Sequence, residues 1–480
     1  MTARKTLPFL TASSAALLLA ACAVGPKAPD AALPPQASGA FIGSQSASVS
    51  TEAARADWWR LYDDAALDGL IQQALTENNE LEAAAANLRA VRASLSEARA
   101  GRLPTTNATA SYNRSQASTI TAPTAGGAEL PEVDTYDVGL DVAYEIDLFG
   151  RVGSAIRAAR ADADAAREAL EVVRISVVAE TARAYADTCS ANAQIAVAER
   201  TIELQGRTLD LTRRLLDAGG GNGLDVAGAA STLEATRATL PPLRAQRDGA
   251  LFRLATLTGR TPAEASEAAR GCQAPPQLSQ PIPIGDGAAL LARRPDVRQA
   301  EARLAAAAAR VNVATASLYP TIRLGGSLGS TALDASDLGE DANFRFSVGP
   351  LISWSFPNIA VARARIKQAD AQTDAALATF DQTVLVALQE TETALSAYAN
   401  ELDRRAALLN ARDQAATAVR LSRLRFEAGA DNFLTLLVSE RALAAADAAL
   451  AASEAQVVTN QIALFKALAG GWTEAPDPEA

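Results

Sequence analysis

Two very long helical runs constrain the fold of this chain more than any other feature. From about residue 151 to 218, and again from about 358 to 428, helix-favouring residues dominate and no proline interrupts them. At about 1.5 Å per residue, each run would form a helix roughly 100 Å long. A helix of that length needs partners along its whole length, so we expect both runs to pack in coils with return helices at about 224–258 and 432–469.

The second half of the chain repeats the first. Three pairs of segments match in the same order: 78–104 with 294–320, 147–170 with 354–377, and 215–226 with 425–436. Alanine-rich helices could match once by chance, but three ordered matches indicate a duplication. Each half is therefore predicted to run helix, extended pair, long helix, glycine break and return helix.

Four segments alternate between apolar and polar residues. They predict strands at about 103–116, 134–148, 320–331 and 343–356. Period two gives each strand one apolar and one polar face, and each is long enough to cross a bilayer at a tilt. A sheet half-buried on a soluble core is the alternative, but repeated carboxylates on the polar face argue against it. Four strands cannot close a membrane barrel, so two or three chains would have to share one, and the alternation does not choose between eight and twelve strands.

The N-terminus reads as a secretory signal peptide over residues 1–21. Arg4 and Lys5 precede a short apolar run that ends in Leu19-Ala20-Ala21-Cys22. This ending resembles a bacterial lipobox, in which Cys22 would be lipidated and become the first mature residue. An ordinary signal peptide with a chance cysteine is the alternative. A Pro-, Ala- and Ser-rich tether follows.

The composition argues against several classes of function. Histidine is absent, which removes the commonest general base and metal ligand. We therefore expect neither an enzyme nor a metal site, and no cofactor besides a covalent lipid on Cys22. A formal charge of −11 argues against a nucleic-acid partner.

Several motifs together carry a family resemblance. They are "CAVGPKAP" after the lipobox, "DWWRLYDDAALDGLIQQAL", "YEIDLFGR", "PIPIGDGAALLARRPDVRQAEARL" and "RFEAGADNFLTLL". With them the chain resembles the TolC-like outer-membrane efflux proteins, in the lipoprotein branch of NodT-type and OprM-type channels. The resemblance implies a mainly α homotrimer with a membrane β-barrel portion. Four strands per chain would build a twelve-stranded barrel in the outer membrane, continued by a helical barrel across the periplasm.

The resemblance also implies a function and a division of the chain. The trimer would be a passive exit duct, served by a periplasmic adaptor protein and an inner-membrane pump of RND type. A non-conducting trimeric lipoprotein scaffold and the duct of a type I secretion system are the alternatives. The expected parts are the signal peptide 1–21, tether 22–56, first repeat 57–260, linker 261–293, second repeat 294–470 and tail 471–480. The linker and both mature ends would form a belt around the helical barrel.

The glycine breaks are the first candidate site. A phosphate loop would need a preceding strand and a nearby lysine, whereas a long helix precedes Gly219 and Asp217 and Asp225 would repel an anion. A left-handed helix end and a tight turn fit better. By resemblance, these turns form a gated periplasmic tip. The candidate gate residues are Gly219, Gly220, Gly221, Asn222, Gly429, Asp431, Phe433 and Leu434.

Asp431 admits two compatible interpretations. Three Asp431 carboxylates at a three-fold axis would repel one another, and a ring of this kind would be poised to widen. Alternatively, Asp431 caps the following helix, because Asp is a favoured N-cap.

Two further sets of residues are candidates. The first would line the water-filled barrel lumen rather than bind a metal: Asp137, Asp141, Glu145, Asp147, Arg323 and Arg345. The second is the pair Cys189 and Cys272. An oxidising periplasm favours a disulfide between them, and two unpaired buried thiols are the other possibility.

Overall fold

The structure is a computed structural model that describes residues 24–27, 29–33, 37, 39–118, 130–355 and 358–468. The predicted signal peptide, Cys22 and the tail 471–480 lie outside the described residues. The chain divides into two compact units, one of residues 1–31, 89–165 and 300–380, the other of residues 32–88, 166–299 and 381–480.

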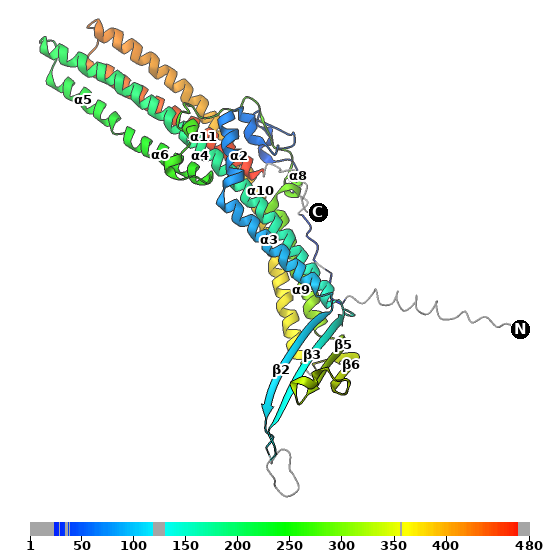
Figure 1. The fold of residues 1–480 in the computed structure, drawn as a ribbon. Helices are drawn as coiled ribbons and strands as arrows, with labels where there is room; N and C mark the ends of the chain where they lie inside the picture. The colour runs from blue at the N-terminus through cyan, green and yellow to red at the C-terminus, as the bar shows by residue number, and fades with distance from the viewer. Residues whose placement is uncertain are drawn as a thin grey trace. The chain divides into compact units, whose positions relative to one another are not determined.

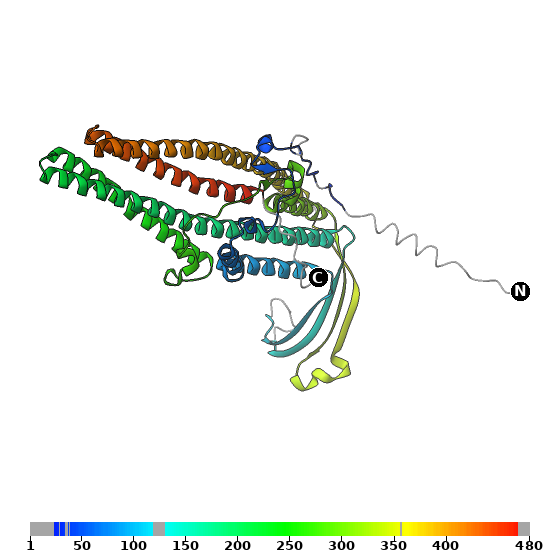
Figure 2. The ribbon, with the colours of Figure 1, turned by 90° about the horizontal axis from the view of Figure 1, so that it is seen from above.

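The first unit contains a four-stranded antiparallel sheet (Figures 1 and 2). Its strands are β2 (Thr105–Ser115), β3 (Val133–Ile146), β5 (Thr321–Ala332) and β6 (Phe344–Ser353), joined in that order. The helix α3 (Asn79–Ala100) leads into β2, and α9 (Pro295–Ala316) leads into β5. Short turns of 3-10 helix, η5 (Ala335–Gly339) and η6 (Asp341–Asn343), connect β5 to β6. The two halves thus place equivalent strand pairs in one sheet.

Two long helices supply residues to both units. They are α4 (Arg151–Asp217) of 67 residues and α10 (Ile359–Glu427) of 69 residues. A mainly helical chain with a sheet of four strands is the predicted fold class, and it is confirmed. Among the described residues, no helix combines the length and the apolar character needed to cross a bilayer.

The second unit holds the return helices. After α4 the chain forms α5 (Gly223–Arg237) and α6 (Leu240–Leu257), and after α10 it forms α11 (Phe433–Ala467). The first return helix, expected at about 224–258, is interrupted, because Pro241 and Pro242 lack the N–H groups of a helix interior and lie instead in the first turn of α6.

The core of the second unit forms where the segment after the tether meets the long helices. Trp58 of η3 (Trp58–Tyr62) stacks on Phe465 of α11 with ring centroids 4.7 Å apart. Asp64 caps α2 (Ala65–Glu77) and accepts a 2.8 Å hydrogen bond from the hydroxyl of Tyr185 on α4. Burial of that hydroxyl raises the pKa of Tyr185. The motif "DWWRLYDDAALDGLIQQAL" is therefore a packing element.

The linker adds short elements to the same unit. From the linker come η4 (Pro262–Glu264), α7 (Glu267–Arg270) and α8 (Gly287–Arg293). The tether adds η2 (Ile42–Gln45), and its strand β1 (Val49–Ser50) pairs in parallel with β4 (Ile282–Pro283) of the linker. The parallel pair ties the tether to the linker.

Candidate functional site

The strand register sorts the sheet into two chemically different faces. On β3, Asp137 lies opposite Thr331, Asp141 opposite Ser327, and Glu145 opposite Arg323. Gly329 of β5 in turn lies opposite Arg345 of β6. One face is therefore built mainly of charged, hydroxyl and glycine residues, and the alternate residues of every strand form the other.

Ion pairs on the polar face join different strands of the sheet, and the pair between β6 and β3 reaches across β5. The guanidinium of Arg345 on β6 lies 2.7 Å from the carboxylate of Asp137 on β3. Glu145 accepts two 2.8 Å hydrogen bonds from Arg151 and lies 3.7 Å from Arg323. Among the described residues, Asp141 has no cationic partner, so it is the candidate lumen carboxylate whose charge is not compensated.

The position of Asp147 in the structure differs from the sequence prediction. The strand β3 ends at Ile146, and the Asp147 carboxylate accepts hydrogen bonds from the N–H groups of Val152 (2.9 Å) and Gly153 (2.6 Å). It therefore satisfies free donors at the start of α4 and is a capping residue rather than a lumen-facing strand residue.

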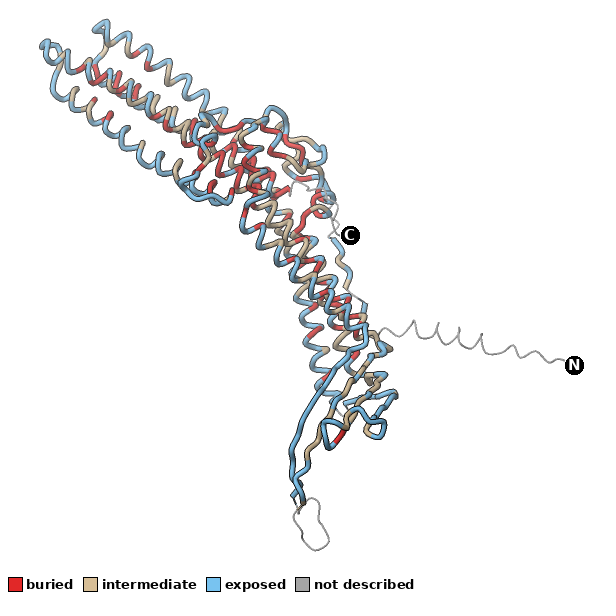
Figure 3. The backbone as a smooth tube through the Cα atoms, viewed as in Figure 1, coloured by how far each residue is buried: buried red, intermediate tan, exposed pale blue. Residues whose placement is uncertain are grey.

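The opposite face of the sheet is apolar and exposed. Figure 3 shows β2 as exposed along its length. Phe346 and Val348 are 74% and 76% exposed in the isolated chain. The other exposed apolar side chains of this face include Val138, Ile146, Leu324, Leu328, Phe344 and Ile352. Water rarely contacts so large an apolar patch on a soluble protein, so this face is a membrane or protein contact surface.

Aromatic side chains flank the apolar face at both ends. Tyr136 lies near one end of β3 and Tyr144 near the other, separated by about 27 Å of strand. Trp354 and the stacked pair Phe149 and Tyr319, with ring centroids 4.7 Å apart, lie where the strands meet the helices. Two aromatic borders around an apolar band are typical of strands that span a membrane.

The two glycine breaks have the same geometry. Gly219 and Gly429 adopt left-handed conformations with φ of +79° and +71°. In each turn, two N–H groups return to carbonyls of the last helical turn: Gly219 to Leu216 and Gly220 to Leu215, and Gly429 to Phe426 and Ala430 to Arg425, all at 2.8–2.9 Å. This is the Schellman pattern that ends a helix, so the breaks are hairpin turns. No phosphate site is built here by the described residues.

The helix cap after the second turn is Asn432 and not Asp431. The Asn432 side chain accepts a hydrogen bond from the N–H of Thr435, as Asn222 does from Asp225 in the first turn. Asp431 instead accepts two hydrogen bonds from Arg425 at 2.7 and 2.9 Å. Arg425 lowers the pKa of Asp431, mainly by hydrogen bonding. The interpretation of Asp431 as a cap is wrong, and the expected repulsion among three bare carboxylates is reduced by the paired arginines.

The two apolar gate candidates separate in the structure. Phe433 is buried against Leu209, Leu233 and Leu437 and so holds the two hairpins together. Leu434 is 62% exposed at the tip, and its counterpart in the first turn, Leu224, is 80% exposed. Of the two, Leu434 is therefore free to face a neighbouring chain or a lumen.

Glu440 is a tip residue that sequence reasoning missed. Its carboxylate is buried and accepts hydrogen bonds from the Thr208 hydroxyl on α4 (2.8 Å) and from Arg423 on α10 (2.6 Å). It thereby links the two hairpins. In an alanine-rich helix such a glutamate looks solvent-exposed, and only its tertiary partners reveal its role.

Replacing Glu440 with Ala is expected to destabilise the tip by about 2 kcal/mol. Arg423 would lose its buried partner, although water could partly compensate because about a third of its side chain is exposed. Urea unfolding checks this, with Glu427→Ala as a control at an exposed tip glutamate that has no ion pair among the described residues. Equal losses in both variants would contradict a linking role for Glu440.

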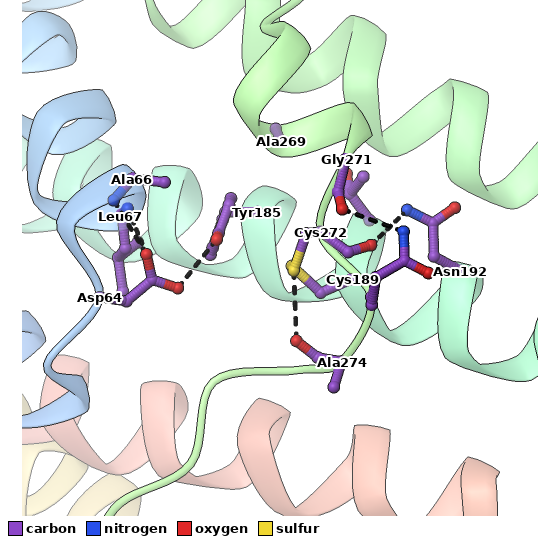
Figure 4. The surroundings of a disulfide bond; sticks show 12 residues. Asp64, Ala66, Leu67, Tyr185, Cys189, Asn192, Ala269, Gly271, Cys272 and Ala274 are labelled. Atoms are coloured by element: carbon purple, nitrogen blue, oxygen red, sulfur yellow. Dashed lines mark hydrogen bonds between the residues drawn. A yellow bond between two sulfur atoms is a disulfide. The ribbon is translucent and has the colours of Figure 1, made fainter.

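The cysteines that remain after Cys22 form a disulfide (Figure 4). Cys189 on α4 and Cys272 just after α7 have Cα atoms 5.0 Å apart and lie 83 residues apart in the chain. One helical turn from Cys189, the side-chain amide of Asn192 donates to the carbonyls of Arg270 and Cys272 at 3.1 and 2.7 Å. The linker is thus held on α4 covalently and by hydrogen bonds.

Across the described ranges, no group of three or more Cys, Asp or Glu residues is placed to hold a metal ion.

Known proteins share both the sequence pattern and the fold. The sequence model of the outer membrane efflux protein family matches residues 70–260 and 288–470. The outer membrane protein OprJ of Pseudomonas aeruginosa is 31% identical over 98% of this chain and 97% of its own length. The toluene efflux pump outer membrane protein TtgI of Pseudomonas putida is 30% identical over 98% of each chain. The solved outer-membrane channel OprN is 36% identical, covers 94% of this chain and all of its own, and superposes with a TM-score of 0.87.

Proposed function

This chain belongs to the outer membrane efflux protein family and is an outer-membrane efflux channel that extends into the periplasm; on that premise we propose that three copies form the passive exit duct of a three-part pump. A periplasmic adaptor and an inner-membrane pump of RND type complete the assembly. Substrate movement is driven by the pump, and this chain makes and breaks no bonds.

The two-faced sheet is the observation that carries this proposal. An apolar face bordered by aromatics suits lipid, and a polar face with paired charges suits a water-filled lumen. The strands β2 and β6 leave unpaired edges, which lipid does not tolerate. Three copies that pair β6 of one chain with β2 of the next close twelve strands around one lumen.

The lipid anchor is the second part of the proposal. We assign the lipid to Cys22, three residues before Gly25. A Cβ on Gly25 would lie 1.9 Å from Oδ1 of Asn312 on α9, so Gly25 is in tight contact with the helix that leads into β5. This contact supports an anchor that enters the membrane beside the strands.

Conductance distinguishes the duct from a non-conducting scaffold. Purified trimers in planar lipid bilayers are expected to show a low conductance at rest that rises when the tip is loosened. If neither the natural protein nor any tip variant conducts, the scaffold is the better interpretation.

The tip is the proposed gate, and Asp431→Arg tests it. The substitution places a second cation beside Arg425 and removes the ion pair that closes the turn, so the single-channel conductance is expected to rise severalfold. Glu427→Arg is the matched control, since it makes the same charge reversal at an exposed tip residue without breaking a described ion pair. Unchanged conductance in the Asp431 variant would remove this residue from the gate.

The same ion pair predicts how the gate responds to pH. Because Arg425 lowers the pKa of Asp431 below 3.8 in the folded protein, the pair persists at neutral and mildly acidic pH and is lost only as the pH falls through that lowered pKa. Conductance is therefore expected to be the same at pH 7 and pH 5. An increase within that range would contradict control by this pair.

A further inference from the structure

The first three turns of both long helices are basic, although the whole chain carries a formal charge of −11. Residues 151–161 of α4 hold three arginines, and residues 359–369 of α10 hold two arginines and a lysine. Neither stretch contains Asp or Glu. Cations at a helix N-terminus oppose the helix dipole, so helix stability does not explain this repeated pattern.

Most of these cations have no anionic partner among the described residues. Arg151 pairs with Glu145, and Arg157 donates to the Ser154 hydroxyl. No carboxylate of the described residues pairs with the remaining four, which are Arg160, Arg363, Arg365 and Lys367. Some other arginines of α4 are paired, such as Arg207 with Glu203.

Two cavities beside the sheet are lined by exposed cations of these helices and of the tether. A cavity of about 540 Å³ between the tether, α4 and α9 is lined by Lys27, Arg157 and Arg160. A second cavity, of about 300 Å³, holds Arg365 together with Trp354. Both lie in the unit that contains the four strands.

The aromatic residues fix the level of these cations relative to the membrane. Trp354 extends the alternation that forms the apolar face of β6 and is 56% exposed, and such aromatics lie at the level of lipid headgroups. Arg365 shares a cavity with it and therefore lies on the lipid side. Lys27 follows the proposed lipid anchor by five residues, so its cavity also faces the membrane rather than the lumen.

We propose that Lys27, Arg157, Arg160 and Arg365 form a phosphate-binding surface for glycerophospholipids of the inner leaflet. This inference rests on the membrane placement proposed above. The recognised group is a phosphodiester monoanion, which arginine binds through two parallel hydrogen bonds. Asp164 lines the same cavity as Arg157 and suits the ammonium group of an ethanolamine headgroup.

Native mass spectrometry of the detergent-solubilised trimer tests the surface. The trimer is titrated with phosphatidylethanolamine, with phosphatidylglycerol and, separately, with inorganic phosphate. The triple variant Arg157→Gln, Arg160→Gln, Arg365→Gln is expected to lose affinity for both lipids by about fivefold for each cation removed. The same three positions changed to Lys keep the charge and are expected to retain most of the binding.

A matched control uses exposed arginines near the other end of the same two helices. Arg200→Gln, Arg213→Gln, Arg420→Gln should bind lipid like the natural protein, since these residues also have no ion pair among the described residues. Undiminished lipid binding in the first triple variant, an equal loss in the control, or binding of inorganic phosphate alone would overturn the proposal. Conductance of the natural trimer reports the channel separately, so failure of the lipid surface and failure of the channel are distinguishable.

Discussion

Removal of the disulfide between Cys189 and Cys272 is expected to lower the free energy of unfolding by about 4 to 5 kcal/mol. The bond closes a loop across 83 residues of sequence, and a cross-link of this length removes much of the conformational freedom of the unfolded chain. The double variant Cys189→Ala, Cys272→Ala is preferred to serine, because Cys189 is fully buried and a hydroxyl there would lack a partner.

Urea unfolding of the natural protein and the double variant measures this loss. Asn192→Ala is the matched control, since it removes two hydrogen bonds to the same linker segment and leaves the disulfide intact. It should cost only about 1 to 2 kcal/mol. If the double variant loses no more than the control, the disulfide does not stabilise the fold as the loop length predicts.

The second large effect is expected on the apolar face of the sheet. Val348 lies near the middle of β6, opposite Gly326, and is 76% exposed in the isolated chain. An arginine at the middle of a bilayer costs about 2 to 4 kcal/mol. We therefore expect Val348→Arg to make the free energy of folding into lipid vesicles less favourable by that amount for each chain.

The adjacent residue provides the control for this substitution. Ser347 lies on the polar face and forms a hydrogen bond with Ser327 of β5. Ser347→Arg would place the same cation in the water-filled lumen, where the cost of burying it in lipid does not arise. The result to be measured is the difference between the two variants in folding into vesicles, and equal losses would contradict the assignment of the two faces.

The regular elements of this fold are predictable because they depend on local periodicity. Alternation over "YDVGLDVAYEI" identifies β3, and the absence of proline identifies α4 and α10. The alternation alone does not show where β3 ends, because it continues through Asp147. The end is set by the hydrogen bonds that Asp147 accepts from the first turn of α4.

The sequence repeat contains the information needed to choose between Asp431 and Asn432 as the helix cap. Asn432 aligns with Asn222, whereas Asp431 aligns with Gly221, which has no side chain to cap a helix. Matching the two turns residue by residue would have identified the cap. The partners of Glu440 and the packing of Phe433 were not predictable in this way, because both depend on contacts between hairpins that are more than two hundred residues apart.

The alternate exposure of neighbouring strand residues to water and lipid tests the central claim most directly. Ser327 and Leu328 are adjacent on β5 but lie on opposite faces of the sheet. Each is replaced by cysteine in the full chain, where Cys189 and Cys272 are already bridged. In reconstituted trimers, a charged, water-soluble maleimide is expected to label Ser327→Cys and to leave Leu328→Cys unlabelled, while a lipid-soluble maleimide should show the reverse preference. Equal labelling of both positions by the water-soluble reagent would contradict a sheet that separates a water-filled lumen from the membrane.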